Sequence, residues 1–265
     1  MPELPEVETT VRRLEPDLVG RTITAVSLKW PRHVVDPNAV LTLLPGRRVT
    51  SLGRRGKYII IYLDPADRTV LIHLRMSGRL HVVAPDAPTD KHAHTILFLD
   101  DGRQLWFSDS RKFGRLYLLV DPETVLGKLG PEPLSTLFTV DWLTEQMSRR
   151  KRVIKSLIME QGFIAGLGNI YADESLYRAG VDPRRPANSL TPAEVALLHA
   201  SIEHVMTEAI EHQGTSLDWV YPGGEMQLRL RVYGRDGQPC PACGAPVERI
   251  VLGQRGTHFC PQCQK

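Results

Sequence analysis

The sequence predicts an α+β protein in which an N-terminal helix and an antiparallel β-sandwich precede a helical domain and a C-terminal β-hairpin. Three observations support this prediction. Short β-rich runs without intervening helices fill the first half, helical spacing begins beyond about residue 130, and all four cysteines lie after residue 239. The expected domains are 1–130, 131–225 and 226–265.

The composition is that of an ordinary globular protein. Apolar residues make up 42% and charged residues 24% of the 265-residue chain, which is long enough to bury one large core or two modest ones. No apolar run is long enough to span a membrane, and the chain starts without a leader segment, so we expect a cytoplasmic protein. The net charge of +3 is weak support for a polyanionic partner, and basic clusters such as 53–57 are typical of solvated surface.

The first helix is expected over residues 5 to about 14, where Val7, Val11 and Leu14 recur at helical spacing. Pro16 should end or kink this helix, because proline lacks a backbone N–H group. From about residue 21 to 120, β-rich runs alternate with turn signals such as "DPAD", "APDAPTD" and "DDG". The runs are "TITAVSLKW", "KYIIIYL", "TVLIHL", "HTILFL", "QLWFSD" and "GRLYLLV".

The later helices follow a linker rich in Pro and Gly, "VDPETVLGKLGPEP". The longest helix should begin after Thr191, which is suited to cap it and to form a capping box with Glu194. Gly214 should mark its end. The other segments with helical spacing are "PLSTLFTVDWLTEQM", "RVIKSLIME" and "NIYADESLYRAG".

The segment "IAGLGNIYADE" predicts two tight turns between helices, a helix–two-turns–helix motif. Gly166 and Gly168 permit close approach of the backbone, and Asn169 is suited to cap the following helix. A helix N-terminus behind a glycine turn can bind phosphate. For this motif alone a plain interhelical turn is the commoner alternative, and the basic cysteine-bearing tail that follows favours phosphate binding.

The cysteines form two C-x2-C pairs, Cys240/Cys243 and Cys260/Cys263, separated by sixteen residues. Two such knuckles present four thiolates to one zinc ion in tetrahedral geometry. Disulfides are the alternative, and a cytosolic chain argues against them. We therefore expect one structural Zn²⁺ per chain, without an open position for catalysis, in a β-hairpin zinc finger that carries Arg255 near its tip.

Two turns at strand ends contain large apolar residues, and one of these turns also contains an arginine. "RMSG" at 75–78 includes Met76, and "SDSRKFG" at 108–114 includes Arg111 and Phe113. Met and Phe at strand ends most often belong to a core. Apolar wedges and an arginine on loops are also what a protein uses to replace an extruded base inside a duplex.

Together these motifs resemble the bacterial formamidopyrimidine-DNA glycosylases, a family also called 8-oxoguanine-DNA glycosylases. The resemblance spans nearly the whole chain. It implies a bifunctional enzyme that removes oxidised purines (8-oxoguanine and formamidopyrimidines) from double-stranded DNA and then cleaves the abasic strand by β,δ-elimination. The matching motifs are "PELPEVET" (2–9), "RRGKY" (54–58), "HLRMSG" (73–78), "SDSRKFG" (108–114), "GLGNIYADESL" (166–176), "VYGRDGQPCPACG" (232–244) and "QRGTHFCPQCQ" (254–264).

The resemblance assigns the chemistry to the start of the chain. Pro2 matches the N-terminal nucleophile, which forms a Schiff base with the sugar once Met1 is removed. Glu3 matches the acid/base residue that protonates the opening sugar ring, and Glu6 falls at the position of a supporting carboxylate. An α-amino group suits the nucleophile's role, because it titrates near about 8 and is partly neutral at pH 7.

The same resemblance implies residues that contact the DNA backbone. Lys57 matches a catalytic lysine that contacts phosphate and assists elimination. Arg255 and Asn169 match phosphate clamps, and Gly168 belongs to the same turn. Lys155 matches a lysine implicated in processing of the damaged base.

The wedge is implied in the same way. Met76 would fill the gap left by the extruded base, Arg111 would read the orphaned base and Phe113 would kink the duplex. His92 is a further implied DNA contact. The family usually has "DPRRFG" where this chain has "DSRKFG", and the arginine and phenylalanine remain.

The stretch at 215–234 looks shorter than the family segment that folds over the extruded base, so the preference between 8-oxoguanine and formamidopyrimidine stays open. An endonuclease VIII-type glycosylase for oxidised pyrimidines is an alternative, although the wedge residues match the purine type. A catalytically silent DNA-binding protein would not need Pro2, Glu3 and Lys57, and a zinc-ribbon module for protein partners leaves the β half unexplained. Nothing in the sequence requires a dimer, so we expect a monomer.

Overall fold

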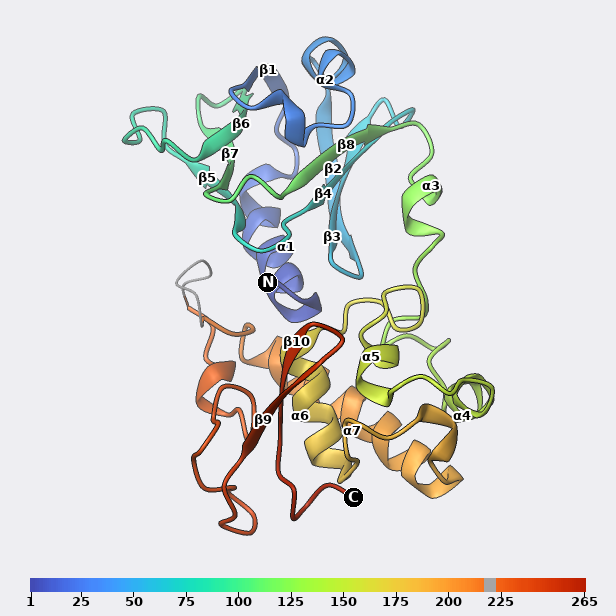
Figure 1. Cartoon of the computed structure of the whole chain (residues 1–265). Helices are drawn as coiled ribbons and strands as arrows, with labels where there is room; N and C mark the ends of the chain where they lie inside the picture. The colour runs from blue at the N-terminus through green and yellow to red at the C-terminus, as the bar shows by residue number, and fades with distance from the viewer. Residues whose placement is uncertain (217–222) are drawn as a thin grey trace. The chain divides into compact units, whose positions relative to one another are not determined.

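The computed structural model describes residues 1–216 and 223–265, and the chain forms two compact units (Figure 1). The first unit comprises Met1–Lys128 together with Ser216 and Gly223, and the second comprises Leu129–Thr215 and Gly224–Lys265. No helix among the described residues is long and apolar enough to cross a membrane.

The first unit is the expected β-sandwich of two four-stranded antiparallel sheets. One sheet has the strand order β2-β3-β4-β8 and the other β1-β6-β7-β5. Three α-helices accompany them among the described residues: α1 (Leu4–Leu18), α2 (Pro37–Leu43) and α3 (Glu123–Leu126). The strands are β1 (Ile23–Leu28), β2 (Arg48–Arg55), β3 (Tyr58–Asp64), β4 (Thr69–His73), β5 (Gly78–Val83), β6 (Ala93–Leu99), β7 (Gln104–Asp109) and β8 (Arg115–Leu119).

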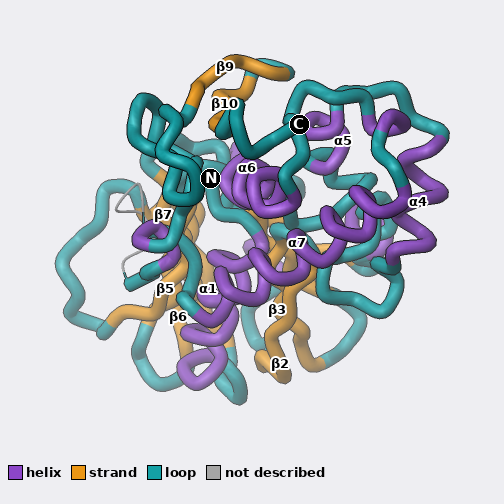
Figure 2. Tube along the Cα trace, turned by 90° about the horizontal axis from the view of Figure 1, so that it is seen from below, coloured by secondary structure: helices purple, strands orange, loops and turns teal. Residues whose placement is uncertain are grey.

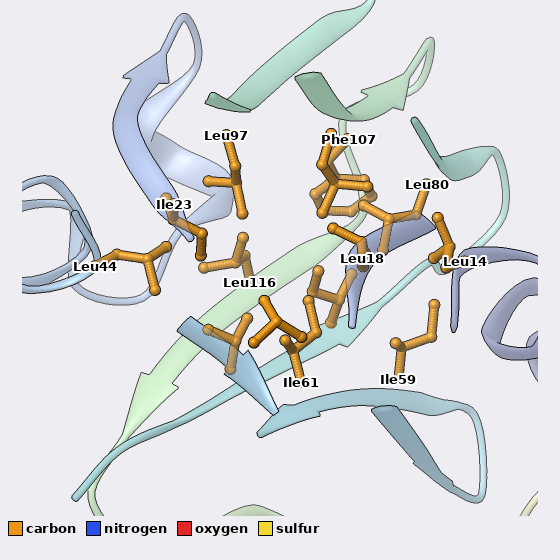
Figure 3. Packing of buried hydrophobic residues seen from close by; sticks show 14 of the residues in the cluster. Leu14, Leu18, Ile23, Leu44, Ile59, Ile61, Leu80, Leu97, Phe107 and Leu116 are labelled. Atoms are coloured by element: carbon orange, nitrogen blue, oxygen red, sulfur yellow. The ribbon is translucent and has the colours of Figure 1, made fainter. Parts of the chain in front are cut away.

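Apolar side chains from both sheets and from α1 fill the space between the layers. Leu14 and Leu18 of α1 belong to this cluster together with Ile59 and Ile61 of β3 and Phe107 of β7 (Figure 3). All five are buried. Burial of each large apolar side chain stabilises the fold by about 1.5–3 kcal/mol. The cluster therefore holds α1, and the residues just before it, firmly against the sheets.

Helix α1 is longer than expected, because it continues through Pro16 to Leu18. Pro16 lies in the last turn, where a missing N–H group costs only one hydrogen bond, the one to the carbonyl of Arg12. The N–H of Val19 donates to the carbonyl of Glu15 at 3.1 Å, so the helix closes normally after the proline. Burial of Leu18 in the core outweighs the lost bond.

Two of the strands, β2 and β5, were not predicted from the sequence. β2 ends in Arg54 and Arg55, which the sequence presents as part of a basic cluster. β5 carries Arg79 and His81 on its more exposed face, next to buried Leu80. Both strands have one polar face, so their apolar alternation is too weak to stand out from a loop.

The second unit contains four α-helices and a two-stranded hairpin among its described residues. Helices α6 and α7 lie side by side, and β10 packs against α6 (Figure 2). The predicted capping box of α7 is confirmed: the N–H of Glu194 donates to Thr191 Oγ1 at 3.3 Å, and the N–H of Thr191 donates to Glu194 Oε2 at 2.7 Å. The elements are α4 (Val140–Ser148), α5 (Ile154–Ile158), α6 (Asn169–Ala179), α7 (Pro192–Glu211), β9 (Glu248–Leu252) and β10 (Arg255–Phe259).

Candidate functional site

The start of α1 explains the spacing of the "PELPE" motif. Glu3 is the N-cap of the helix, and its backbone N–H donates to Glu6 Oε2 at 2.8 Å. Pro5 lies in the first turn, where a backbone N–H would have no helical partner. Glu3 and Glu6 are 2% and 3% exposed. The backbone on either side of Glu3 is therefore fixed, and with it the position of Pro2.

Lys57 lies in the tight turn between β2 and β3, next to Gly56, whose φ of 58° is left-handed. The hairpin is tied to α1 by an ion pair in which Arg54 Nε lies 2.9 Å from Glu8 Oε2. The same guanidinium donates through Nη1 to the carbonyl of Gly56 at 3.3 Å. The first unit thus joins the turn that carries Lys57 to the N-terminal half of α1.

His73, at the end of β4, is a residue whose role sequence reasoning missed. Its Nδ1 accepts the N–H of Arg75 at 3.0 Å, and its ring meets Tyr58 edge-on with centroids 4.8 Å apart. Burial lowers the pKa of His73 to about 3, and the nearby charges of Arg75 and Lys57 act in the same direction. The ring is therefore neutral and carries its proton on Nε2. The only sequence signal was its place in "HLRMSG".

The proposed wedge residues stand at the surface of the first unit. Met76 and Phe113 are 37% and 49% exposed. The guanidinium of Arg111 lies over the ring of Phe113, 5.3 Å from its centroid. His92 is half-buried and lines a small cavity of about 180 Å³, which Arg79 also lines. Exposed apolar and cationic side chains on two turns are suited to enter a base stack.

In the second unit, the glycine turn before α6 differs in one detail from the prediction. Gly168 is the N-cap in an extended conformation, and Asn169 is the first residue of the helix rather than its cap. Its amide instead donates through Nδ2 to the carbonyl of Gly256 in the hairpin, at 3.0 Å. Gly166 has a φ of 91°, a conformation that favours glycine. The glycine turn is thereby bonded to the hairpin.

Lys155 is buried beneath the same hairpin. Its Nζ donates to the carbonyl of Gly256 at 2.9 Å and to Thr257 Oγ1 at 2.8 Å, and it forms an ion pair with Asp173. The N–H of His258 in turn donates to Asp173 Oδ2 at 2.9 Å. A lysine with these partners holds protein groups together, and the contact of Lys155 with DNA that the resemblance implied stays a prediction.

The hairpin presents Arg255 as predicted. Its two-residue turn, Gly253 and Gln254, has positive φ at both positions, the geometry that suits the twist of antiparallel strands. Arg255 pairs with Leu252 directly beside this turn, and its side chain is exposed. An exposed arginine at a rigid tip is suited to bind phosphate.

The four cysteines fit a tetrahedral zinc ion. Their sulfur atoms all lie within 4.8 Å of one another, with 3.9 Å between Cys240 and Cys263 and 3.5 Å between Cys243 and Cys260. Zinc–sulfur bonds of about 2.3 Å in a tetrahedron require sulfurs about 3.8 Å apart. All four thiols are free rather than disulfide-bonded. They would hold one ion with no open position.

Glu174 anchors the chain that leads into the first knuckle, another role that the sequence did not reveal. Its carboxylate accepts the N–H groups of Arg231, Val232 and Tyr233 at 2.8, 3.0 and 2.8 Å. Burial raises the pKa of Glu174, and the three backbone donors act in the opposite direction. The side chain fixes the start of the zinc-binding segment on α6.

Three family models match the chain in order. The formamidopyrimidine-DNA glycosylase N-terminal domain matches residues 1–116, the formamidopyrimidine-DNA glycosylase H2TH domain matches residues 129–220, and the zinc finger found in FPG and IleRS matches residues 237–265. The chain belongs to the formamidopyrimidine-DNA glycosylase family.

Full-length relatives agree with this assignment. The formamidopyrimidine-DNA glycosylase of Herpetosiphon aurantiacus is 47% identical over 275 residues, with both chains covered completely. The crystal structure of a family member from Thermus thermophilus has a TM-score of 0.89 at 42% identity and covers 99% of this chain and 98% of that one. A Lactococcus lactis family member, in complex with DNA containing N7-benzyl-Fapy-dG, has a TM-score of 0.95 at 38% identity, with complete coverage of both chains.

Membership in the formamidopyrimidine-DNA glycosylase family confirms the predicted fold and the four-cysteine zinc finger. It also sets aside the zinc-ribbon module for protein partners, since the model for the N-terminal domain accounts for the β half. The stretch at 215–234, on which the lesion preference was left open, contains residues 217–222, which lie outside the described part of the chain.

Proposed function

We infer that this chain is a DNA glycosylase and abasic-site lyase that removes 8-oxoguanine and formamidopyrimidine lesions from DNA. The observation that carries this inference is the fixed N-terminus, where Glu6 holds the backbone of Glu3 and so positions Pro2. Relatives of the same family have been crystallised with DNA that contains an abasic site, carbocyclic 8-oxoG or Fapy-dG. The same substrates are proposed for this chain.

The reaction begins at Pro2 once Met1 has been removed. Its neutral amine attacks C1′ of the lesion's sugar, the N-glycosidic bond breaks, and the base leaves with a proton. Glu3 protonates the ring oxygen as the sugar opens, which leaves an iminium ion between C1′ and Pro2. The iminium acidifies the C2′ proton, so that loss of this proton expels the 3′ phosphate, and a second elimination expels the 5′ phosphate.

Lys57, Asn169 and Arg255 are proposed to act on phosphate. Arg255 stands exposed at the hairpin tip, and Asn169 belongs to the glycine turn at the start of α6. The N-terminal end of that helix favours negative charge. Lys155 is proposed to support Arg255, since it holds the hairpin strand that begins with Arg255.

Met76, Arg111 and Phe113 are proposed to fill the stack when the lesion is extruded. Extrusion costs a few kcal/mol of unpairing and unstacking, and side chains that enter the gap offset part of that cost. Arg111 is the member of the three that carries hydrogen-bond donors, so it is the one suited to read the orphaned base.

The division into domains at 1–130, 131–225 and 226–265 is retained as part of this proposal, as is action as a monomer. A cytoplasmic location is proposed because the DNA substrate of a bacterial cell lies there. The four cysteines would hold the structural zinc ion, which keeps the hairpin folded and takes no part in the bond changes.

The test is incubation with four matched duplexes that carry 8-oxoguanine, a formamidopyrimidine, an abasic site or an oxidised pyrimidine. The expected result is cleavage of the first three, with phosphate on both new ends, as β,δ-elimination requires. Preferential cleavage of the oxidised pyrimidine would instead assign the chain to the endonuclease VIII type of activity, and binding without cleavage would reduce it to a DNA-binding protein.

A further inference from the structure

Asp109, the last residue of β7, has a buried carboxylate that closes the turn beyond it. Its Oδ2 accepts the N–H of Gly114 at 2.7 Å, and its Oδ1 accepts the N–H of Arg111 at 3.1 Å. Gly114 is needed for this approach, because a Cβ there would lie 2.4 Å from Cζ of Phe107. The two ends of the turn that carries Arg111 and Phe113 are therefore bonded to one carboxylate.

The same carboxylate reaches the other proposed wedge turn. Ser77, the neighbour of Met76, donates through Oγ to Oδ1 of Asp109 at 2.5 Å, and its Oγ accepts the N–H of Arg111 at 3.3 Å. The strands support this contact, since Gly78 of β5 pairs directly with Asp109 of β7. Buried charge is stable only when it is well hydrogen-bonded, and here the donors come from both turns.

A second set of contacts holds the Arg111–Phe113 turn from another side. Nζ of Lys112 lies 4.2 Å from the ring centroid of Trp30, and the φ of Lys112 is 59°. His33 stacks on Phe107 beneath the turn, with centroids 5.2 Å apart. Because these contacts do not involve Ser77, loss of the Ser77 hydroxyl should uncouple the two turns without unfolding either.

We propose that Asp109 is a positioning residue that fixes the Met76 turn and the Arg111–Phe113 turn as one rigid unit, so that the three side chains enter the DNA stack together. This inference rests on the wedge role given under the proposed function. Side chains held by one support lose little freedom when they enter the gap, so more of their contact energy offsets the cost of extrusion.

The first test compares Ser77→Ala and Asp109→Asn with the control Ser110→Ala. This control removes a hydroxyl of the same turn, one that forms no hydrogen bond with Ser77 or Asp109 among the described residues. Single-turnover kcat/KM is measured on an 8-oxoguanine duplex and on a single-stranded abasic site. Loss of one hydrogen bond corresponds to about a 2- to 10-fold effect. We expect kcat/KM on the duplex to fall by this factor in Ser77→Ala and by about 10-fold or more in Asp109→Asn. Neither variant should lose activity on the single-stranded abasic site. Ser110→Ala should match the native protein on both substrates.

The second test measures the coupling between the turns. In the native background, the effects of Met76→Ala and Phe113→Ala on duplex cleavage should be non-additive, because both depend on one support. In the Ser77→Ala background, the fold-changes in duplex cleavage caused by Met76→Ala and Phe113→Ala should multiply, as those of independent substitutions do. Fluorescence of 2-aminopurine opposite the lesion gives a readout of stacking that does not depend on catalysis, and its rise on binding should shrink in Ser77→Ala.

Three results would overturn the proposal, and they are distinguishable. If Met76→Ala and Phe113→Ala slow duplex cleavage but Ser77→Ala leaves both the rate and the coupling unchanged, the wedge role stands and the positioning role of Asp109 is wrong. If neither Met76→Ala nor Phe113→Ala affects the duplex, the wedge role itself fails and this inference fails with it. Equal losses on duplex and single strand would mean that the Ser77–Asp109 contact is merely structural.

Discussion

Lys155 Nζ lies 2.7 Å from Asp173 Oδ1, and both side chains are almost completely buried, at 1% and 0% exposure. The pair joins α5 and α6 to the hairpin strand β10, because Lys155 also donates to Gly256 and Thr257 while Asp173 accepts from His258. Arg255 directly precedes Gly256. The ion pair therefore fixes the position of Arg255 through contacts within the protein.

Replacing Lys155 with Met should weaken DNA binding by displacing the hairpin. The substitution leaves the Asp173 carboxylate buried without its cation, which costs about 3–5 kcal/mol of folding stability. The loss of affinity should be the same for damaged and undamaged duplexes, measured by fluorescence anisotropy. Lys128→Met, at an exposed lysine, is the matched control. Normal affinity combined with a defect confined to base release would show that Lys155 acts on the lesion instead.

Arg255→Ala should weaken binding to all duplexes alike, because a phosphate contact carries no sequence information. The slope of log affinity against log salt should fall by about one unit, the value for one lost phosphate contact. Arg149→Ala removes an exposed arginine paired with Glu145 and serves as the control. A loss confined to one base sequence would contradict the clamp role.

Arg111→Ala should lose the discrimination between cytosine and adenine opposite 8-oxoguanine. The guanidinium supplies the donors that can reach acceptors on the pairing edge of an orphaned cytosine. Met76→Ala and Phe113→Ala should lower kcat/KM with every opposite base, because they contribute apolar contact alone. Rates on the four opposite bases for each variant decide the matter, and an unchanged preference in Arg111→Ala would make the turn purely structural.

Acid should destabilise the protein in part through His73. Its pKa is about 3 in the folded state because of burial and the charges of Arg75 and Lys57, against about 6.5 when unfolded. Between these values the unfolded state binds the extra proton, so stability falls as pH decreases below 6.5, with a slope of up to about 1.4 kcal/mol per pH unit. Well above pH 6.5 neither state binds this proton, and the contribution of His73 to the pH dependence disappears.

His73→Asn should flatten that dependence, because Asn can still accept the N–H of Arg75 but does not titrate. Urea unfolding at pH 7.5 and 4.5 measures the difference in stability for both proteins. His212→Asn, a half-exposed histidine just after α7, is the control and should leave the slope unchanged. An identical pH dependence in native protein and His73→Asn would show that His73 is not held neutral.

Much of the fold was predictable because its signals are local. The cap of α7 at Thr191 and Glu194 and the spacing of the four cysteines depend on neighbours in sequence, and the structure confirms them. The expectation that the helix would end or kink at Pro16 was wrong. A proline near a helix end costs little folding free energy when Leu18 can be buried. Local propensity does not contain that tertiary contribution.

The supporting residues of the site could not be predicted, because their roles depend on contacts distant in sequence. Asp109 meets Ser77 across 32 positions, and Lys155 meets Thr257 across 102. Asn169 shows the same limit: its residue type predicts an N-cap, yet its amide bonds to Gly256 in the hairpin. In each case the sequence indicates a polar side chain without indicating its partner.

The most direct test concerns the nucleophile, Pro2. The protein is incubated with an 8-oxoguanine duplex and borohydride, the covalent adduct is digested, and the modified peptide is located by mass spectrometry. We expect Met1 to be absent and the reduced sugar to be attached to the nitrogen of Pro2, while Pro2→Gly sharply reduces trapping. An adduct on a lysine such as Lys57, or undiminished trapping by protein that retains Met1 or carries an acetylated Pro2, would contradict the proposed mechanism.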